Sequence, residues 1–268
     1  AAYAGIGGTV EPMSGLAALQ QTPDGAPLNS GIMYPDPAGG LLGCAALLIA
    51  LHHCWRTGEG QYIDFSLQES TLTFMSDQIL TYTLSGQLPP RLGNRDPWMA
   101  PHGNYPCQGA DTWVAIAVRS DAEWQRLCSV LGAPAWTHEA RLATAAGRRA
   151  HSDTLDAQLA TWTRSHAADT ITRLLQEQGI PSAPVLTPGL VFDNPHLQAR
   201  HFFSPLTHPD VGTTQSPGIP WRLSRTPGRI RRPAPGLGEH NEEVLGTLLG
   251  RSAEEINALR DQGVTGRP

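Results

Sequence analysis

The sequence predicts an α/β protein built from two bodies. Helical spacing of apolar residues and short strand patterns alternate along residues 38–86, and both return along residues 103–197. With 268 residues, 40% of them hydrophobic, the chain can bury one sizeable core or two smaller ones. Between the bodies, prolines and glycines interrupt any regular element and predict a linker or site loop over residues 87–102: Pro89, Pro90, Gly93, Pro97 and Pro101.

The first body is predicted to run helix, strand, helix. Residues 38–56 are small and apolar on nearly all sides, which favours a buried helix, and the TGEG turn at 57–60 ends it. The stretch QYIDFSL at 61–67 alternates polar and apolar side chains, as a strand does, and residues 68–86 return to helical spacing. About thirty residues rich in Gly, Ala and Pro precede this body and are expected to form a loop laid across it.

The second body alternates in the same way. TWVAIAV at 112–118 and IPSAPVL at 180–186 are predicted strands, and a helix capped by Ser120 is expected between them. Two further helices are expected over 150–178, the second closed by Gly179. After a proline-rich stretch at 194–232, the chain is predicted to finish with two helices, the second opened by a capping box of Ser252 and Glu255.

Composition excludes several classes of function. The net charge of −5 predicts no nucleic-acid or anionic-membrane surface, and the apolar run at 41–51 is too short to span a bilayer. Every basic side chain is arginine, so Schiff-base chemistry and a phosphate-loop lysine are excluded. The four cysteines form no CxxC pair, which favours a cytoplasmic location, and no residues are spaced to bind a metal.

One carboxylate, Asp36, lies between Pro35 and Pro37 at the start of the apolar helix. Proline at a first helical position loses no hydrogen bond, so Pro37 is expected to begin the helix, where backbone dipoles favour a carboxylate and the oxyanions formed from it. Gly39 and Gly40 would leave room for a bulky substrate to approach the backbone. From the residues alone, two interpretations stay open: Asp36 is a helix cap, or it is a nucleophile.

Four stretches, taken in order, resemble the class III coenzyme A transferases, the CaiB/BaiF family. The first contains Asp36, the small-residue helix and a TG-x-GQ turn, and the second ends a loop with an Ala-Pro-x-Gly-x-Tyr step. The four are PDPAGGLLGCAALLIALHHCWRTGEGQYIDFSLQES (35–70), PRLGNRDPWMAPHGNYPCQGADTWVAIAV (90–118), SDAEWQRLCSVLG (120–132) and PAPGLGEHNEEVLGTLLGRSAEEINALRDQGV (233–264).

The resemblance implies a partial Rossmann-like large domain and a smaller α/β domain in an interlocked dimer. Residues 1–86, which carry Asp36, and 198–268, a return linker and terminal helices, would belong to the large domain, with 103–197 as the small one. Family members carry well over a hundred residues before the Asp36 segment, so the chain resembles the C-terminal two thirds of a member. We therefore expect a homodimer, or a heteromer with a chain that supplies the N-terminal half.

The resemblance also implies an activity: transfer of coenzyme A from an acyl-CoA thioester to a small carboxylic acid, with Asp36 as the covalent nucleophile and no permanently bound cofactor. Gly93, Asn94, His102 and Gly103 match the family loop that closes over the acyl site. Several relatives carry a run of glycines there that this chain lacks, which leaves the acyl group it admits open.

Two alternatives remain. An α-methylacyl-CoA racemase of the same family would use the matching aspartate as one of two bases, and its histidine partner would precede this segment. Racemase relatives place a glutamate near the start of the helix after the VAIAV-type strand, whereas this chain has Arg119, Ser120 and Asp121 there, which favours a transferase. The other alternative is a non-catalytic half-site subunit that needs a partner chain.

Overall fold

The computed structural model describes residues 4–20 and 25–265. The chain divides into two compact units, Ala1–Val185 and Leu186–Pro268. Both contain helices and small antiparallel sheets, so the mixed α/β class is confirmed.

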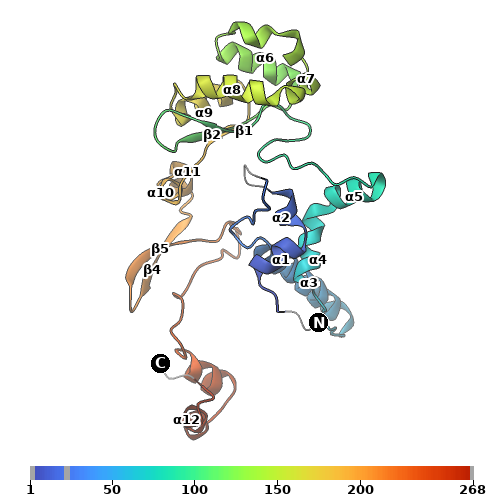
Figure 1. Ribbon diagram of the computed structural model, residues 1–268. Helices are drawn as coiled ribbons and strands as arrows, with labels where there is room; N and C mark the ends of the chain where they lie inside the picture. Colours follow the sequence, from blue (N-terminus) through green and yellow to red (C-terminus); the bar gives the residue numbers. More distant parts are fainter. Residues whose placement is uncertain (1–3, 21–24, 266–268) are drawn as a thin grey trace. The chain divides into compact units, whose positions relative to one another are not determined.

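The first part of unit 1 is helical (Figure 1). Helices α1 (Gly7–Met13) and α2 (Leu16–Leu19) precede the long α3 (Pro35–Thr57), which ends at Gly58 in the left-handed conformation. Then follow α4 (Leu67–Leu72), a 3₁₀ turn (Thr73–Met75) and α5 (Ser76–Ser85). Helix α1 packs against both α3 and α4, so the residues expected to form a loop include a helix that positions its neighbours.

Two further predictions for this region are wrong. Residues 58–66 form no strand, because they pair with neither of the described sheets and a strand needs a hydrogen-bonded neighbour. Helix α3 is not buried: only Pro35, Ala38 and Gly39 are, while Trp55 is 77% exposed and Leu48 58%. A helix that is apolar on every side cannot be covered by the two short helices that contact one end of it. By length and composition alone α3 could also cross a membrane, a test that core helices of soluble proteins also pass.

Residues 100–185 form what we call the β1–β3 body. Its sheet has the order β1 (His102–Pro106), β2 (Trp113–Ala117), β3 (Ser182–Pro184), antiparallel throughout, with Tyr105 opposite Val114. The helices α6 (Asp121–Val130), α7 (Ala145–Ala150), α8 (Ser152–Thr163) and α9 (Ala168–Glu177) gather beside it (Figure 1). The two predicted strands, the Ser120 cap on Glu123 and the stop at Gly179 are confirmed, whereas β1 was not predicted.

The core of this body is continuous. It joins Val114 and Ile116 of β2 to apolar side chains from the helices: Trp124, Leu127, Leu155, Leu159, Ile171 and Leu175. Arg148 is fully buried but satisfied, since it donates to Ala100 O (2.7 Å) and Leu142 O (3.1 Å) and pairs with Asp121 (2.9 Å). Its guanidinium group also lies 5.3 Å from the centre of the Trp124 ring.

Unit 2 is built from smaller pieces. Helices α10 (Pro188–Phe192) and α11 (Pro195–Ala199) lead into a hairpin of β4 (Phe203–His208) and β5 (Gly212–Pro217). A π-helical segment (Glu242–Leu248) and α12 (Ala253–Asp261) follow, and the predicted capping box of Ser252 and Glu255 opens α12. The first of the two terminal helices is therefore π-helical, a wider form than the sequence suggested.

Candidate active site

Asp36 lies in the first turn of α3. The helix begins at Pro35, two residues before the predicted start, so Asp36 is its second residue. Its backbone N–H donates to Met33 O (2.9 Å), and its carboxylate belongs to an exposed residue. The positive end of the helix dipole favours negative charge at this position. An exposed residue at a helix start is accessible to a substrate.

The turn that precedes Asp36 is fixed by unusual backbone geometry. Gly31 and Met33 both have positive φ, 79° and 51°, and for a side chain such as that of Met33 this conformation is strained. Tyr34 then contacts Phe74 edge to face, with ring centres 5.8 Å apart. Such strain persists only where surrounding contacts determine the backbone, so the chain holds this turn in one shape.

Gly7, at the start of α1, lies directly against the Asp36 carboxylate. A Cβ atom at Gly7 would come within 2.4 Å of Asp36 Oδ2 and 2.7 Å of Oδ1, so no other residue fits there without moving the carboxylate. At Gly8, by contrast, an added Cβ would meet nothing within 4 Å. Sequence reasoning missed Gly7. The signal was the GIGG stretch at 5–8, which composition alone assigned to a loop.

The two glycines after Asp36 have different surroundings. An added Cβ at Gly39 would come within 2.3 Å of Leu67 Cδ1, so this buried glycine lets α4 approach α3. Gly40 is exposed and faces open space, where a bulky substrate could approach the helix backbone. Of the two, Gly40 has the surroundings that the sequence argument assumed.

The other four predicted site residues form a second cluster. Gly93, Asn94, His102 and Gly103 all line a hollow of about 560 Å³ on the β1–β3 body, and His102 Nδ1 lies 2.7 Å from Asn94 O. Asp36 is not among the residues that line this hollow. The linker residues 93–94 are thus brought to the first strand of the sheet.

Arg95 anchors the same loop and was missed by sequence reasoning. Its guanidinium group pairs with Asp153 (2.7 Å) and Asp156 (2.8 Å), and the hydrogen bond to Asp153 is the largest cause of its raised pKa. Asp156 also accepts from the Tyr105 hydroxyl (2.8 Å). Burial, and then the negative charge of Asp156, raises the pKa of Tyr105. Both acids lie about sixty positions along the chain from Arg95, which is why no local motif revealed them.

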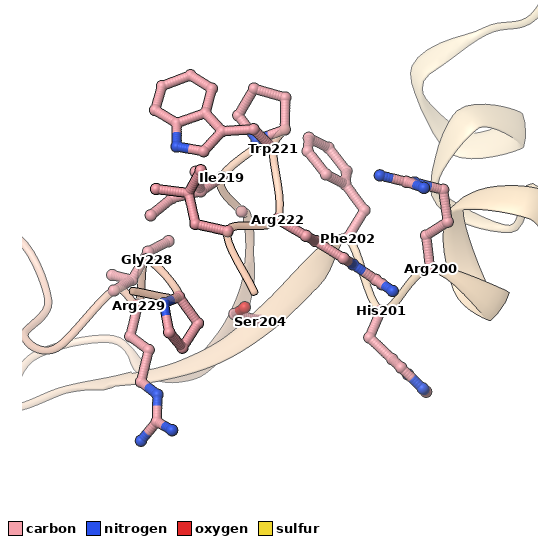
Figure 2. A pocket seen from close by; sticks show the side chains of 14 residues that line it. Arg200, His201, Phe202, Ser204, Ile219, Trp221, Arg222, Gly228 and Arg229 are labelled. Carbon is pink, nitrogen blue, oxygen red and sulfur yellow. The ribbon is translucent and has the colours of Figure 1, made fainter. Parts of the chain in front are cut away.

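A further hollow, of about 620 Å³, lies in unit 2, and none of the predicted site residues lines it. Three arginines, Arg200, Arg222 and Arg229, line it beside Trp221. Figure 2 shows the Arg229 guanidinium group directed away from those of Arg200 and Arg222. Because Arg229 points away from the other two, the three guanidinium groups do not converge on one point. Within residues 4–20 and 25–265, no group of three or more His, Cys, Asp or Glu side chains could hold a metal.

Comparison with known proteins identifies relatives along most of the chain. The family model described as CoA-transferase family III matches residues 1–241. The succinyl-CoA–D-citramalate CoA-transferase of Chloroflexus aurantiacus is 32% identical over 261 residues, which cover 97% of this chain and 65% of the relative. The succinate–glutarate CoA-transferase of Agrobacterium fabrum is 34% identical over 248 residues, with coverage of 92% and 61%.

A crystal structure of a CaiB/BaiF family protein from Brucella suis superposes with a TM-score of 0.79 at 28% identity, covering 91% of this chain and 63% of that one. The chain thus spans less than two thirds of the length of these relatives. The match to the family model, the identity to named transferases and the shared fold agree with one another. The chain belongs to CoA-transferase family III.

Proposed function

We propose that this chain carries the nucleophile of an enzyme that transfers coenzyme A between an acyl-CoA thioester and a carboxylic acid, and that Asp36 is that nucleophile. The observation that carries the proposal is the exposed Asp36 carboxylate at the start of α3, set against the backbone of Gly7. A carboxylate can form a covalent intermediate with an acyl group, and exchange of one thioester for another needs no external energy source.

The reaction proceeds through an anhydride and an aspartyl thioester. An oxygen of Asp36 attacks the thioester carbon, the C–S bond breaks, and CoA thiolate leaves. The thiolate attacks the Asp36 carbonyl carbon of the mixed anhydride, which releases the donor acid and forms aspartyl-CoA. The acceptor carboxylate then attacks the aspartyl thioester and expels the thiolate, which attacks the acceptor acyl carbon and regenerates Asp36. Each tetrahedral intermediate gains negative charge near the positive end of α3, which stabilises it.

The names of the relatives suggest substrates. Two of them act with succinyl-CoA or succinate and a second dicarboxylic acid, so succinyl-CoA is the first donor to test. We assign the hollow at Gly93, Asn94, His102 and Gly103 to the acyl or acceptor group. Coenzyme A is then a substrate and no resident cofactor is needed. We also propose that the enzyme is soluble and cytoplasmic.

The racemase alternative is less well supported. Exchange of a proton at the carbon next to the thioester needs two acid–base groups that face that carbon. Racemase relatives are expected to carry a glutamate near the start of the helix after the VAIAV strand, where this chain has Arg119, Ser120 and Asp121. The named relatives are also transferases.

We further propose that the active enzyme contains more polypeptide than this chain alone, as a homodimer or as a heteromer. One relative, the succinyl-CoA–L-malate CoA-transferase of Chloroflexus aurantiacus, has alpha and beta subunits. The exposed apolar side chains of α3 fit such an arrangement. Native mass spectrometry tests it: a dimer of this chain alone that binds coenzyme A would refute the half-site alternative, and a stoichiometric larger partner would support it.

Trapping of the intermediate tests the activity. The purified assembly is mixed with a panel of acyl-CoA thioesters, succinyl-CoA first, and quenched with hydroxylamine, and its peptides are mapped by mass spectrometry. A hydroxamate on the Asp36 peptide is expected, because hydroxylamine cleaves both the anhydride and the aspartyl thioester. Bound coenzyme A without any adduct would refute the nucleophile and favour the racemase.

A further inference from the structure

Helix α1 contacts the Asp36 segment at a second point, through a buried carboxylate. Glu11 is only 1% exposed, and its two oxygens accept from the same residue: Oε1 from the backbone N–H of Ser30 (2.6 Å) and Oε2 from the Ser30 hydroxyl (2.9 Å). A buried carboxylate is costly unless it is satisfied by hydrogen bonds, and bonds to a charged acceptor are short and strong. Both oxygens of Glu11 are therefore committed to fixing Ser30.

Ser30 begins the short segment that ends at Asp36. The strained Met33 lies within this segment, and the Tyr34–Phe74 ring contact holds its far side. The near side is held by α1, since Asn29 Nδ2 donates to Gly8 O (3.1 Å) and Ser30 donates twice to Glu11. A segment fixed at both ends has little freedom to move the residue it carries.

Gly7 and Glu11 are four residues apart in α1, and residues at that spacing lie on one face of a helix. The same face therefore touches the Asp36 segment twice: at the carboxylate itself through Gly7, and at Ser30 through Glu11. Contact through Gly7 requires a close approach of α1, and the Glu11 bonds hold α1 at that distance. Buried polar partners of this kind fix one arrangement where apolar contacts would permit several.

We propose that Glu11 is a positioning residue for the nucleophile: through Ser30 it holds the Asp36 carboxylate in place against α1. Glu11 itself touches no substrate. The proposal rests on the proposed function of Asp36, and it assigns a role to the one carboxylate of α1, which the transfer mechanism does not use.

The test compares three variants in the active assembly. Glu11→Ala removes both bonds to Ser30. Glu11→Gln keeps an oxygen for the Ser30 N–H and offers an amide N–H to a hydroxyl that can rotate to accept it. The matched control is Glu123→Ala, since Glu123 is also a buried carboxylate, 5% exposed, that accepts from Arg119 N (2.7 Å) and from the Arg119 side chain on the β1–β3 body.

The main readout is the single-turnover rate of formation of the Asp36 adduct at saturating acyl-CoA, with the concentration that gives half the maximal rate. A displacement of the reacting group by about 1 Å can slow a reaction by about 100-fold, so Glu11→Ala should slow adduct formation by about 10- to 100-fold and leave the half-saturating concentration unchanged. Glu11→Gln should recover most of the rate. Glu123→Ala should stay within about 2-fold of the parent, because distant sites act independently. An unchanged rate in Glu11→Ala would overturn the proposal, as would an equal loss in Glu123→Ala.

Two further measurements cover the cases in which Glu11→Ala does not fold or the parent forms no adduct. If Glu11→Ala does not fold, Ser30→Ala keeps the backbone bond to Glu11 and loses the two bonds of its hydroxyl, to Glu11 (2.9 Å) and from Ile32 N–H (3.4 Å). It should slow adduct formation by about 3- to 10-fold, and an unchanged rate would overturn the proposal. If the parent forms no adduct at all, the nucleophile assignment fails separately, and amide hydrogen exchange still tests the contact. Exchange at Ser30 should be faster in Glu11→Ala than in the parent, and equal exchange would show that Glu11 fixes nothing.

Discussion

The β1–β3 body buries its apolar side chains, whereas helix α3 leaves many of its own exposed. The body buries a continuous core from β2, α6, α8 and α9, and even its buried Arg148 has partners for its donors. Helix α3 also carries many apolar side chains, yet Leu41, Leu47, Leu48, Ile49 and Trp55 are all exposed. Apolar content therefore does not determine burial. Burial requires that the rest of the chain supply a complementary surface.

The few buried residues of α3 are informative. Pro35, Ala38 and Gly39 are all in the first turn and a half, beside Asp36, where α1 and α4 pack. The end of the helix that carries the proposed nucleophile is thus anchored by its own chain, and the remainder is left for other contacts. This arrangement fits a site whose position is fixed internally while its surroundings are completed by further polypeptide.

The sharpest test of this contrast is the loss of the proposed nucleophile, because it should abolish activity without disturbing the core of the β1–β3 body. Asp36→Ala should lower transfer by at least about 10³-fold, since the covalent route is lost. Its free energy of unfolding should change by less than about 1 kcal/mol, the usual contribution of an exposed acid in a first helical turn. Steady-state transfer with succinyl-CoA and urea unfolding measure the two effects. Turnover equal to that of the parent would contradict the assignment.

A substitution in the core of the β1–β3 body should lower stability far more than a substitution on the exposed side of α3. Leu159→Ala creates a cavity in the core of the β1–β3 body and should cost about 2–5 kcal/mol, whereas Leu48→Ala, at an exposed position of α3, should change the stability of the isolated chain by less than about 0.5 kcal/mol. Urea unfolding measures the change in free energy of unfolding for both variants. Native-state hydrogen exchange at the β2 amides follows the stability of the β1–β3 body itself. If Leu48→Ala costs as much as Leu159→Ala, α3 is covered in solution and the contrast fails.

The sequence predicted the self-contained region well and the other region poorly. In the β1–β3 body, the Ser120 cap, the Gly179 stop and two strands follow from local patterns whose partners lie within the body. For α3, the run of small and apolar residues predicted the helix but not the exposure of its side chains to solvent. The strand expected at 61–67 likewise needs a neighbour that local sequence cannot supply. Periodicity reports what a segment could bury, and tertiary contacts decide whether it does.

The candidate site also contains one residue that local sequence marks and others that only tertiary contacts reveal. Prolines and glycines mark Asp36 locally, and the resemblance to the family selected it as the candidate nucleophile. Gly7 and Glu11 were missed, since their importance comes from contacts 29 and 19 positions away that no motif encodes. Arg95 was missed for the same reason. Contacts between residues so far apart in the sequence become visible only once the elements are packed.

The close approach of α1 to Asp36 can be tested with a pair of neighbouring glycines. Gly7→Ala would place a methyl group where the Asp36 carboxylate lies and should slow adduct formation by about 100-fold, because the carboxylate must move. Gly8→Ala meets open space and should leave the rate within about 2-fold of the parent. Single-turnover trapping measures both. Equal rates in the two variants would mean that the carboxylate is free to adapt and is not held against α1.

The smallest expected effect depends on pH and concerns Tyr105 in the core of the β1–β3 body. Burial, and then the charge of Asp156, raises the pKa of Tyr105 above the unfolded value of about 10. The stabilising contribution of the protonated hydroxyl is therefore complete below pH 10, and it is lost as pH rises beyond that, by about 1.4 kcal/mol per pH unit.

Urea unfolding at pH 8 and pH 11 should show this loss in the parent and in Tyr62→Phe, a change at a residue that is 91% exposed, and not in Tyr105→Phe. Cys107 and Cys128, whose thiol pKa values are also raised by burial, contribute equally to all three proteins, so the difference between variants isolates Tyr105. The same alkaline loss in Tyr105→Phe would mean that this hydroxyl ionises in the folded body as freely as in the unfolded chain, and that the body is less closed to water than its core implies.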